Sequence, residues 1–192
     1  MEDYLRPTET IDCDHPRVSA VARELSHAAK DPLAIAKRCF EWVRDEIRHS
    51  GDYRLDGPVT CSASEVLAAR VGLCYGKSHL LAALLRANSI PAGLCYQRFL
   101  AHKGNARFGL HGLNAVYLPD IGWYRIDPRG NKEGVDAQFP PPAEKLAFTA
   151  AAKGEADLPE VWPDALPQIV SILRSCRTYD EVLKSRRDIE MI

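Results

Sequence analysis

The chain has 192 residues, of which 46% are hydrophobic and 27% are charged, and its formal net charge is −1 at pH 7. This composition is typical of a soluble globular protein, and the length suffices for one domain with its own core. A chain so close to neutrality has no broad basic surface, so we expect neither nucleic acid nor an anionic membrane to be its main partner.

The first residues and the cysteines favour a reducing, cytoplasmic location. Residues 1–12 are polar and acidic and lack the basic and apolar segments of a signal peptide, and no apolar stretch in the sequence is long enough to span a bilayer. No two cysteines form a CxxC pair, and a chain of this length does not need disulfides, so we expect free thiols. The six cysteines are Cys13, Cys39, Cys61, Cys74, Cys95 and Cys176.

Two helices are predicted in the first 50 residues. Apolar residues recur at three- and four-residue spacing within residues 15–30, which indicates an amphipathic helix. Asp31 and Pro32 begin a second helix, because aspartate is a favoured N-cap and proline fits the first turn. Residues 50–60 are predicted to form a loop.

A short helix and then a long apolar helix are predicted next. Ser62 and Glu65 have the spacing of a capping box, and we expect Gly72 to end the helix that they begin. The second of these helices is expected from about Cys74 to Asn88, with four leucines on one face.

Strands and then helices are predicted in the second half of the chain. The expected strands are residues 92–100, 109–118 and 122–128, and the expected closing helices are residues 164–176 and 178–190. The turn at residues 119–122 predicts a hairpin, and the proline run within residues 139–145 excludes a central strand there.

The order of these elements, helices, then strands, then helices, predicts an α+β fold. We expect a single domain over residues 1–192, with a core at about residues 30–130 and a C-terminal helical extension at about residues 143–192. In this arrangement the N-terminal helices and the central helix pack on an antiparallel sheet. No feature of the sequence indicates an oligomeric state.

Cys74 is a candidate nucleophile because of its position. A thiol attacks only as a thiolate, and a free cysteine with a pKa of about 8.5 is mostly protonated at neutral pH. The start of a helix carries partial positive charge on its N–H groups, which favours the thiolate and can bind an oxyanion. A buried, purely structural cysteine is the alternative interpretation.

A thiol nucleophile needs a histidine, and the chain has six of them: His15, His27, His49, His79, His102 and His111. His79 is expected to point away from Cys74 on the same helix. The first three are expected at the surface or at helix ends, and His102 lies in a polar loop. His111 begins a predicted strand at the edge of the sheet, where an ordinary surface histidine is the competing interpretation.

An acid on the neighbouring strand could orient the imidazole of His111. Asp127 ends the next strand, although an Asp-Pro turn is also a common way to end a strand. Asp120 is a rival, but it lies in the hairpin turn.

The segments GLCYGKSHLLAALLRANSIPAGLCY, HGLNAVYL and GWYRIDP together resemble the transglutaminase-like superfamily. The resemblance spans roughly residues 30–130 and implies a papain-like core with the nucleophile at the start of the central helix. It assigns Cys74 as the nucleophile, His111 as the base and Asp127 as the orienting acid. Leu113 and Ala115 depart from the tryptophan and glutamate common in the family, which weakens the analogy for the substrate more than that for catalysis.

A symmetrical hairpin turn would place Asp127 opposite Asn114, three residues from His111. That is about 10 Å along a strand. A contact between Asp127 and His111 therefore requires a bulge or a shifted register.

The resemblance implies a thiol-dependent hydrolase or acyltransferase that acts on an amide or peptide bond through a thioester. Its expected partner is a peptide or protein substrate, without a metal or organic cofactor. Hydrolysis is favoured over crosslinking because the sequence has no calcium loop of the D-x-[DN]-x-[DN]-G type.

Two alternatives stay open. The first is a non-catalytic binding module on the same fold, although such a module has no need of Cys74, His111 and Asp127 together. A metal site built from Cys61, Cys74, Cys95 and His111 lacks the usual ligand spacing.

Overall fold

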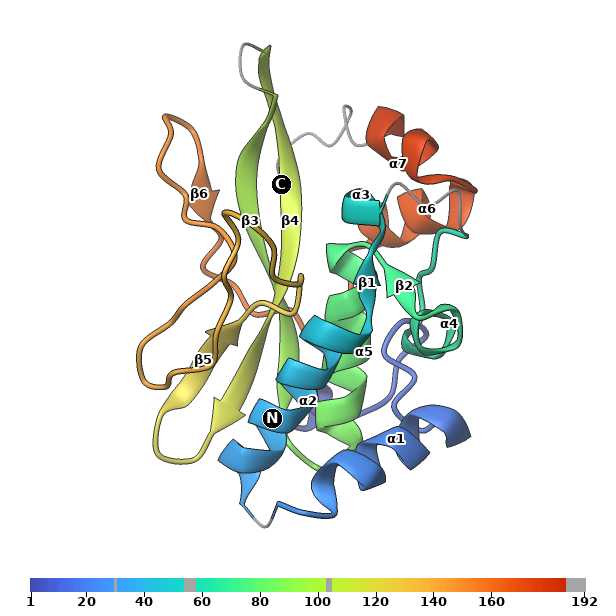
Figure 1. Ribbon diagram of the computed structural model, residues 1–192, viewed down its shortest axis with the longest axis vertical. Helices are drawn as coiled ribbons and strands as arrows, with labels where there is room; N and C mark the ends of the chain where they lie inside the picture. The colour runs from blue at the N-terminus through green and yellow to red at the C-terminus, as the bar shows by residue number, and fades with distance from the viewer. Residues whose placement is uncertain (30, 54–57, 103–104, 186–192) are drawn as a thin grey trace.

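The computed structural model describes residues 1–29, 31–53, 58–102 and 105–185. These residues form an α+β fold in which helices pack on one face of a curled sheet (Figure 1). The helices are α1 (Pro16–Ser26), α2 (Pro32–Glu46), α3 (Ser50–Tyr53), α4 (Ala63–Ala69), α5 (Cys74–Ala87), α6 (Pro167–Ser175) and α7 (Tyr179–Ser185). The strands are β1 (Arg48–His49), β2 (Val71–Gly72), β3 (Ala92–His102), β4 (Asn105–Leu118), β5 (Gly122–Ile126) and β6 (Ala156–Asp157).

Helix α5 is the centre of the molecule. It contacts α1, α2 and α4 on one side and β3 and β4 on the other, as Figure 1 shows. Every residue from Cys74 to Arg86 is buried, so the helix has no solvent face. A helix that is enclosed all round is a core element, and its first residue is correspondingly fixed in place.

The predicted N-caps are confirmed. Asp31 caps α2 by accepting a hydrogen bond from the amide of Ala34, and Ser62 and Glu65 form the capping box of α4. The predicted end of α4 at Gly72 is wrong. The helix ends at Ala69, because Arg70 adopts the left-handed conformation that terminates it, with φ of 56°.

A parallel two-stranded sheet follows the ends of α2 and α4, and it was not predicted. Arg48 pairs with Val71 and His49 pairs with Gly72. The prediction of a loop from residue 50 is wrong for α3, and residues 54–57 of that predicted loop lie outside the described residues. The pairing matters because it places His49 beside the residues that lead into α5.

The second sheet has the order β5-β4-β3-β6, with antiparallel pairs throughout. The predicted hairpin is confirmed, but its register differs by one residue. Asn114 pairs with Ile126, and the pairing continues in register to Leu118 and Gly122. The expectation that Asn114 lies opposite Asp127 is therefore wrong, since Asp127 comes directly after the last paired residue of β5.

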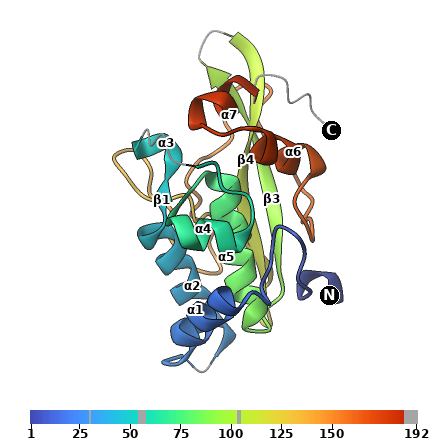
Figure 2. The same cartoon turned by 90° about the vertical axis from the view of Figure 1, so that its right-hand side faces the viewer.

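The C-terminal segment returns to the end of the molecule where α5 begins. Figures 1 and 2 both place α6 and α7 at the same end as α3. The two predicted closing helices are confirmed at Pro167–Ser175 and Tyr179–Ser185, and residues 186–190 of the second prediction lie outside the described residues. In the part of the chain that the structure describes, no helix has the length and apolar character to cross a bilayer.

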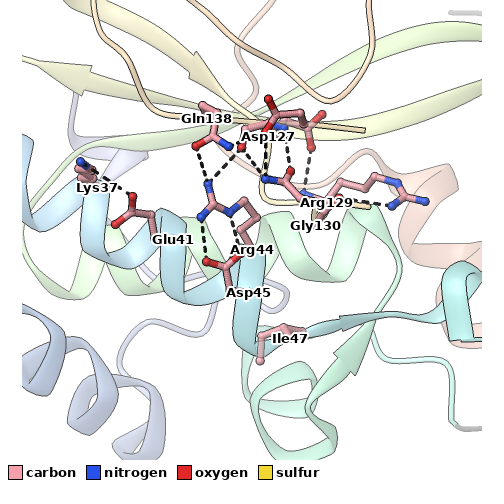
Figure 3. Close-up of polar contacts among 12 residues, drawn as sticks. Lys37, Glu41, Arg44, Asp45, Ile47, Asp127, Arg129, Gly130 and Gln138 are labelled. Atoms are coloured by element: carbon pink, nitrogen blue, oxygen red, sulfur yellow. Dashed lines mark hydrogen bonds and ion pairs between the residues drawn. The ribbon is translucent and has the colours of Figure 1, made fainter. Parts of the chain in front are cut away.

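The end of α2 is joined to the segment that follows β5. Figure 3 shows the guanidinium of Arg44 between Asp45 and Gln138. Its Nη1 also donates to the carbonyl of Ala137 at 3.1 Å. This contact holds the helical layer against the segment that follows the Asp127 turn.

Candidate active site

Cys74 is the first residue of α5, as predicted. The preceding residue, Leu73, is the N-cap, and its side chain has no oxygen that could cap the helix. The positive end of the helix dipole therefore acts on the thiol directly, which favours its ionised form. The residue is only 3% exposed, so its charge is weakly screened by water.

The structure brings Cys74, His111 and Asp127 together. The Nε2 atom of His111 donates to Oδ2 of Asp127 at 2.8 Å, and the Cys74 thiol lies within hydrogen-bonding reach of the His111 ring. Because Nε2 is engaged by the carboxylate, Nδ1 is the nitrogen available to the sulfur. The predicted shift in register is present, without a bulge between β4 and β5. Asp127 follows the last paired residue of β5, and its side chain reaches back to His111.

Asp127 is fully buried, and three neighbouring residues act on its ionisation. Burial alone would raise its pKa, but the charge and hydrogen bond of His111, together with two backbone N–H donors, lower it. The backbone N–H groups of Arg129 and Ala147 also donate to the carboxylate, at 3.1 and 3.2 Å. The pKa of Asp127 therefore lies below its ordinary value, and the group is an anion.

His111 has the opposite shift. Burial opposes its charged form, but the carboxylate of Asp127 and the neighbouring Cys74 raise the pKa of His111 well above its ordinary value. The ring packs edge-on against Phe148 at a centroid distance of 5.0 Å, so it is also fixed in orientation. β4 is an inner strand, but β5 pairs with it only from Asn114 onward, so at His111 the strand is paired with β3 alone, through Gln97. The competing interpretation of a surface histidine is wrong, because His111 is buried.

Gly112 allows the strand that carries His111 to approach α5. A Cβ atom at this position would lie 2.7 Å from Cδ1 of Tyr75, the residue after Cys74. The hydroxyl of Tyr75 donates to the carbonyl of Leu110 on the same strand. The backbone of β4 is therefore held against the first turn of α5, next to the thiol.

His49 is a second histidine at the thiol, and its expected surface or helix-end position is wrong. It ends β1, is largely buried, and lies within hydrogen-bonding reach of Cys74. Burial lowers the pKa of His49, and the charge of Arg129 lowers it further. The residue was missed because two paired strands of two residues each have no periodicity that a sequence pattern can reveal.

The sequence model of the Transglutaminase-like superfamily matches residues 19–128, which is more than half of the chain. The chain belongs to the transglutaminase-like superfamily. The matched region contains Cys74, His111 and Asp127, and it ends directly after the acid. No curated protein sequence matches the chain.

Two solved structures resemble this transglutaminase-like chain. One is a protein from Cytophaga hutchinsonii assigned as a cysteine protease, with 20% identity, a TM-score of 0.53 and coverage of 66% of this chain. The other is the periplasmic domain of TgpA from Pseudomonas aeruginosa, with 22% identity, a TM-score of 0.49 and the same coverage of this chain. The chain spans 40% and 45% of the length of these two structures. The likeness to the Cytophaga hutchinsonii protein concerns the fold.

A small hollow lies next to residues that flank the candidate site, and neither Cys74 nor His111 is among the residues that line it. Its walls come from the residues on either side of the site, since Leu73 precedes Cys74 and Ser50 follows His49. Val59 and Val71 make the hollow partly apolar, and Tyr179 of α7 completes it.

The remaining cysteines lack the environment of Cys74. All six cysteines are free and buried. Burial raises the pKa of Cys39 and of Cys95 to about 12, and that of Cys61 to about 11. Burial also raises the pKa of Cys13. These thiols are small apolar core groups, as most of the six were expected to be.

The other candidates lie away from the thiol. His79 turns its Nδ1 to the carbonyl of Cys61 at 2.7 Å, and His15 caps α1. Asp120, the rival acid, lies exposed in the turn between β4 and β5. Among the described residues, no three His, Cys, Asp or Glu side chains are grouped as ligands for a metal ion.

Proposed function

We propose that this protein is a thiol-dependent hydrolase or acyltransferase that cleaves an amide or peptide bond through a thioester on Cys74. The supporting observation is the contact of His111 with both partners, with Asp127 at 2.8 Å from Nε2 and the thiol within reach of the ring. A cysteine, an imidazole and an orienting carboxylate in this order are the groups that acyl transfer to sulfur requires.

The steps follow from the charges of the site. Sγ of Cys74 transfers its proton to Nδ1 of His111, and the imidazolium is stabilised by the anion of Asp127. The thiolate attacks the acyl carbon, the C–N bond breaks, and the leaving amine takes the proton from His111. Water then loses a proton to His111 and attacks the thioester, which releases the acid and restores the thiol.

We propose that hydrolysis is the main outcome, and that the substrate is a peptide or protein in a reducing, cytoplasmic environment. Cys74 is 3% exposed and His111 is 6% exposed. A water molecule reaches a thioester in such a site more easily than an amine on a second protein does.

The test is alkylation by iodoacetamide as a function of pH, with the modified thiols located by mass spectrometry. We expect Cys74 to be alkylated well below pH 8 and the other buried thiols to be protected, because their pKa values are raised. In His111→Ala, the pH at which Cys74 is half-maximally reactive moves upward toward the value of about 8.5 for a free cysteine.

The exposed His27 offers a matched control, since His27→Ala leaves the site intact. If Cys74 reacts no faster than the other thiols, or if His111→Ala does not change its profile, the enzyme proposal is wrong. A non-catalytic binding module on the same fold then becomes the better interpretation.

A further inference from the structure

His49 is held at the thiol by its backbone on two sides. It pairs with Gly72, two residues before Cys74, and the amide of the adjacent Arg48 donates to the carbonyl of Arg70 at 3.0 Å. On the other side, the Nζ atom of Lys77 in α5 donates to the carbonyl of Ile47. The nucleophile helix therefore fixes the position of this histidine as well as that of the cysteine.

The ring of His49 is held in one tautomer. Its Nδ1 accepts a hydrogen bond from the amide of Gly51 at 3.1 Å, so the hydrogen of the neutral ring is on Nε2. Gly51 is suited to this contact, because a Cβ there would lie 3.2 Å from the His49 ring and 2.7 Å from the hydroxyl of Tyr179. The ring thus presents one N–H donor in the neighbourhood of the sulfur.

The two histidines at the thiol differ in their acidic partners. His111 has the carboxylate of Asp127 at 2.8 Å, whereas His49 has that of Asp52 at 4.0 Å. Asp52 is also neutralised by the two nitrogens of Arg129, at 2.6 and 2.7 Å, and by Lys132. Only one of the two imidazoles therefore has a carboxylate that supports its positive charge.

We propose that His49 is a catalytic residue that donates a hydrogen bond from Nε2 to the oxyanion formed when Cys74 attacks the acyl carbon. The inference rests on the proposed function and adds the side-chain donor of the oxyanion site, beside the N–H groups at the start of α5. The Sγ–C bond forms while the C=O π pair moves to oxygen. His49 binds that oxygen without transferring its proton, and all proton transfer stays with His111.

Two reactions of Cys74 separate this role from thiolate formation. Alkylation by iodoacetamide needs the thiolate and forms no oxyanion. Acylation by p-nitrophenyl acetate needs the thiolate and passes through a tetrahedral oxyanion. Both rates are measured across pH, and their limiting values at high pH are compared, because there the thiol is ionised in every variant.

We expect His49→Phe, which retains a ring of similar size without a donor, to lower the limiting acylation rate by about 10²- to 10³-fold. The limiting alkylation rate should stay within about threefold. His49→Gln carries an amide N–H at nearly the position of Nε2 and should recover most of the loss, which also shows that the site still folds. His27→Ala should change neither rate.

An equal loss of both reactions, or no loss in either, would overturn the role of His49 as an oxyanion donor. The failure of the proposed function has a different signature. In that case Cys74 of the unmodified protein shows no preferential alkylation below pH 8, whatever the residue at position 49.

Discussion

At the scale of single residues, two histidines beside one sulfur, His111 and His49, have pKa values shifted in opposite directions. The pKa of His111 is raised by a carboxylate in direct contact, and the pKa of His49 is lowered by burial, with Asp52 too distant to reverse the effect. A site with one charged and one neutral imidazole can transfer a proton with the first and donate a fixed hydrogen bond with the second.

Gly112 gives a prediction at this scale. In Gly112→Ala the new methyl group would lie 2.7 Å from the ring of Tyr75, so β4 has to move away from α5. We expect Cys74 to lose at least about tenfold in alkylation rate at pH 6, because a shift of about 1 Å separates His111 from the thiol. The rate of iodoacetamide labelling checks this.

Gly109 is the matched control, since a Cβ there has no atom within 4 Å. Gly109→Ala should retain the wild-type labelling rate and thermal midpoint. Equal rates in the two variants would show that the close approach of β4 to Tyr75 does not position His111.

At the scale of elements, α5 is joined to the end of α2 by a buried amine. The Nζ atom of Lys77 donates to the carbonyl of Arg44 at 3.2 Å and to that of Ile47. Burial, together with the charge of Arg129, lowers the pKa of Lys77 to about 7. The lysine replaces the hydrogen bonds that carbonyls at the end of a helix lack.

Lys77→Met tests this junction through the pH dependence of stability. Between pH 7 and the ordinary lysine value of 10.5, the unfolded chain holds a proton that the folded chain has released. The stability of the wild type therefore rises with pH in this interval, and the variant loses that contribution. At pH 10 we expect the variant to be less stable by about 1–3 kcal/mol, because two buried carbonyls lose their donor.

Urea unfolding at pH 7, 8.5 and 10 measures the difference, which should grow with pH. Lys37→Met is the control, since the side chain of Lys37 is 54% exposed and forms only a surface pair with Glu41. A difference between Lys77→Met and the wild type that is constant with pH would contradict a neutral buried amine.

The elements divide into those that local patterns predict and those that need long-range contacts. Asp31 and the capping box at Ser62 define helix starts within a few residues, and both predictions are confirmed. Helix α4 ends at Ala69 because Arg70 adopts the left-handed backbone conformation. Residues other than glycine rarely adopt this conformation, so the sequence does not predict it. The paired strands β1 and β2 exist only because α2 and α4 end side by side, which no local pattern contains.

The same division applies to the site. The order of Cys74, His111 and Asp127 along the chain predicts three residues that the structure does bring together. The predicted register of the hairpin was wrong by one residue, because the residues of a turn do not determine which two strand positions face each other. His49 required knowledge of the parallel pairing with Gly72, so sequence patterns alone assigned it to the surface or to a helix end.

At the scale of the whole molecule, one ion-pair cluster connects the helical layer to the segment after β5. Asp52 of α3 accepts two hydrogen bonds from Arg129, at 2.6 and 2.7 Å, and also pairs with Lys132. Arg129 is two residues after Asp127 and is only 7% exposed. The cluster thus fixes the segment that carries His49 relative to the segment that carries Asp127.

Asp52→Ala should destabilise the protein by roughly 2–4 kcal/mol, because the buried guanidinium of Arg129 loses its carboxylate. The double variant Asp52→Ala/Arg129→Met should be less destabilised than the sum of the two single variants. A double-mutant cycle by urea unfolding at pH 7 measures this coupling. Asp3→Ala, which removes an exposed pair with Arg6, should have little effect, and strictly additive losses at Asp52 and Arg129 would contradict the coupling.

The enclosure of α5 has a consequence for motion in the site. A helix buried from Cys74 to Arg86 exchanges its amide hydrogens only when most of the fold opens. The histidines, in contrast, come from β1 and β4, and β1 is a strand of two residues. The sulfur is therefore the stationary point of the site, and a substrate that reaches it is expected to be admitted by movement of the chain outside α5.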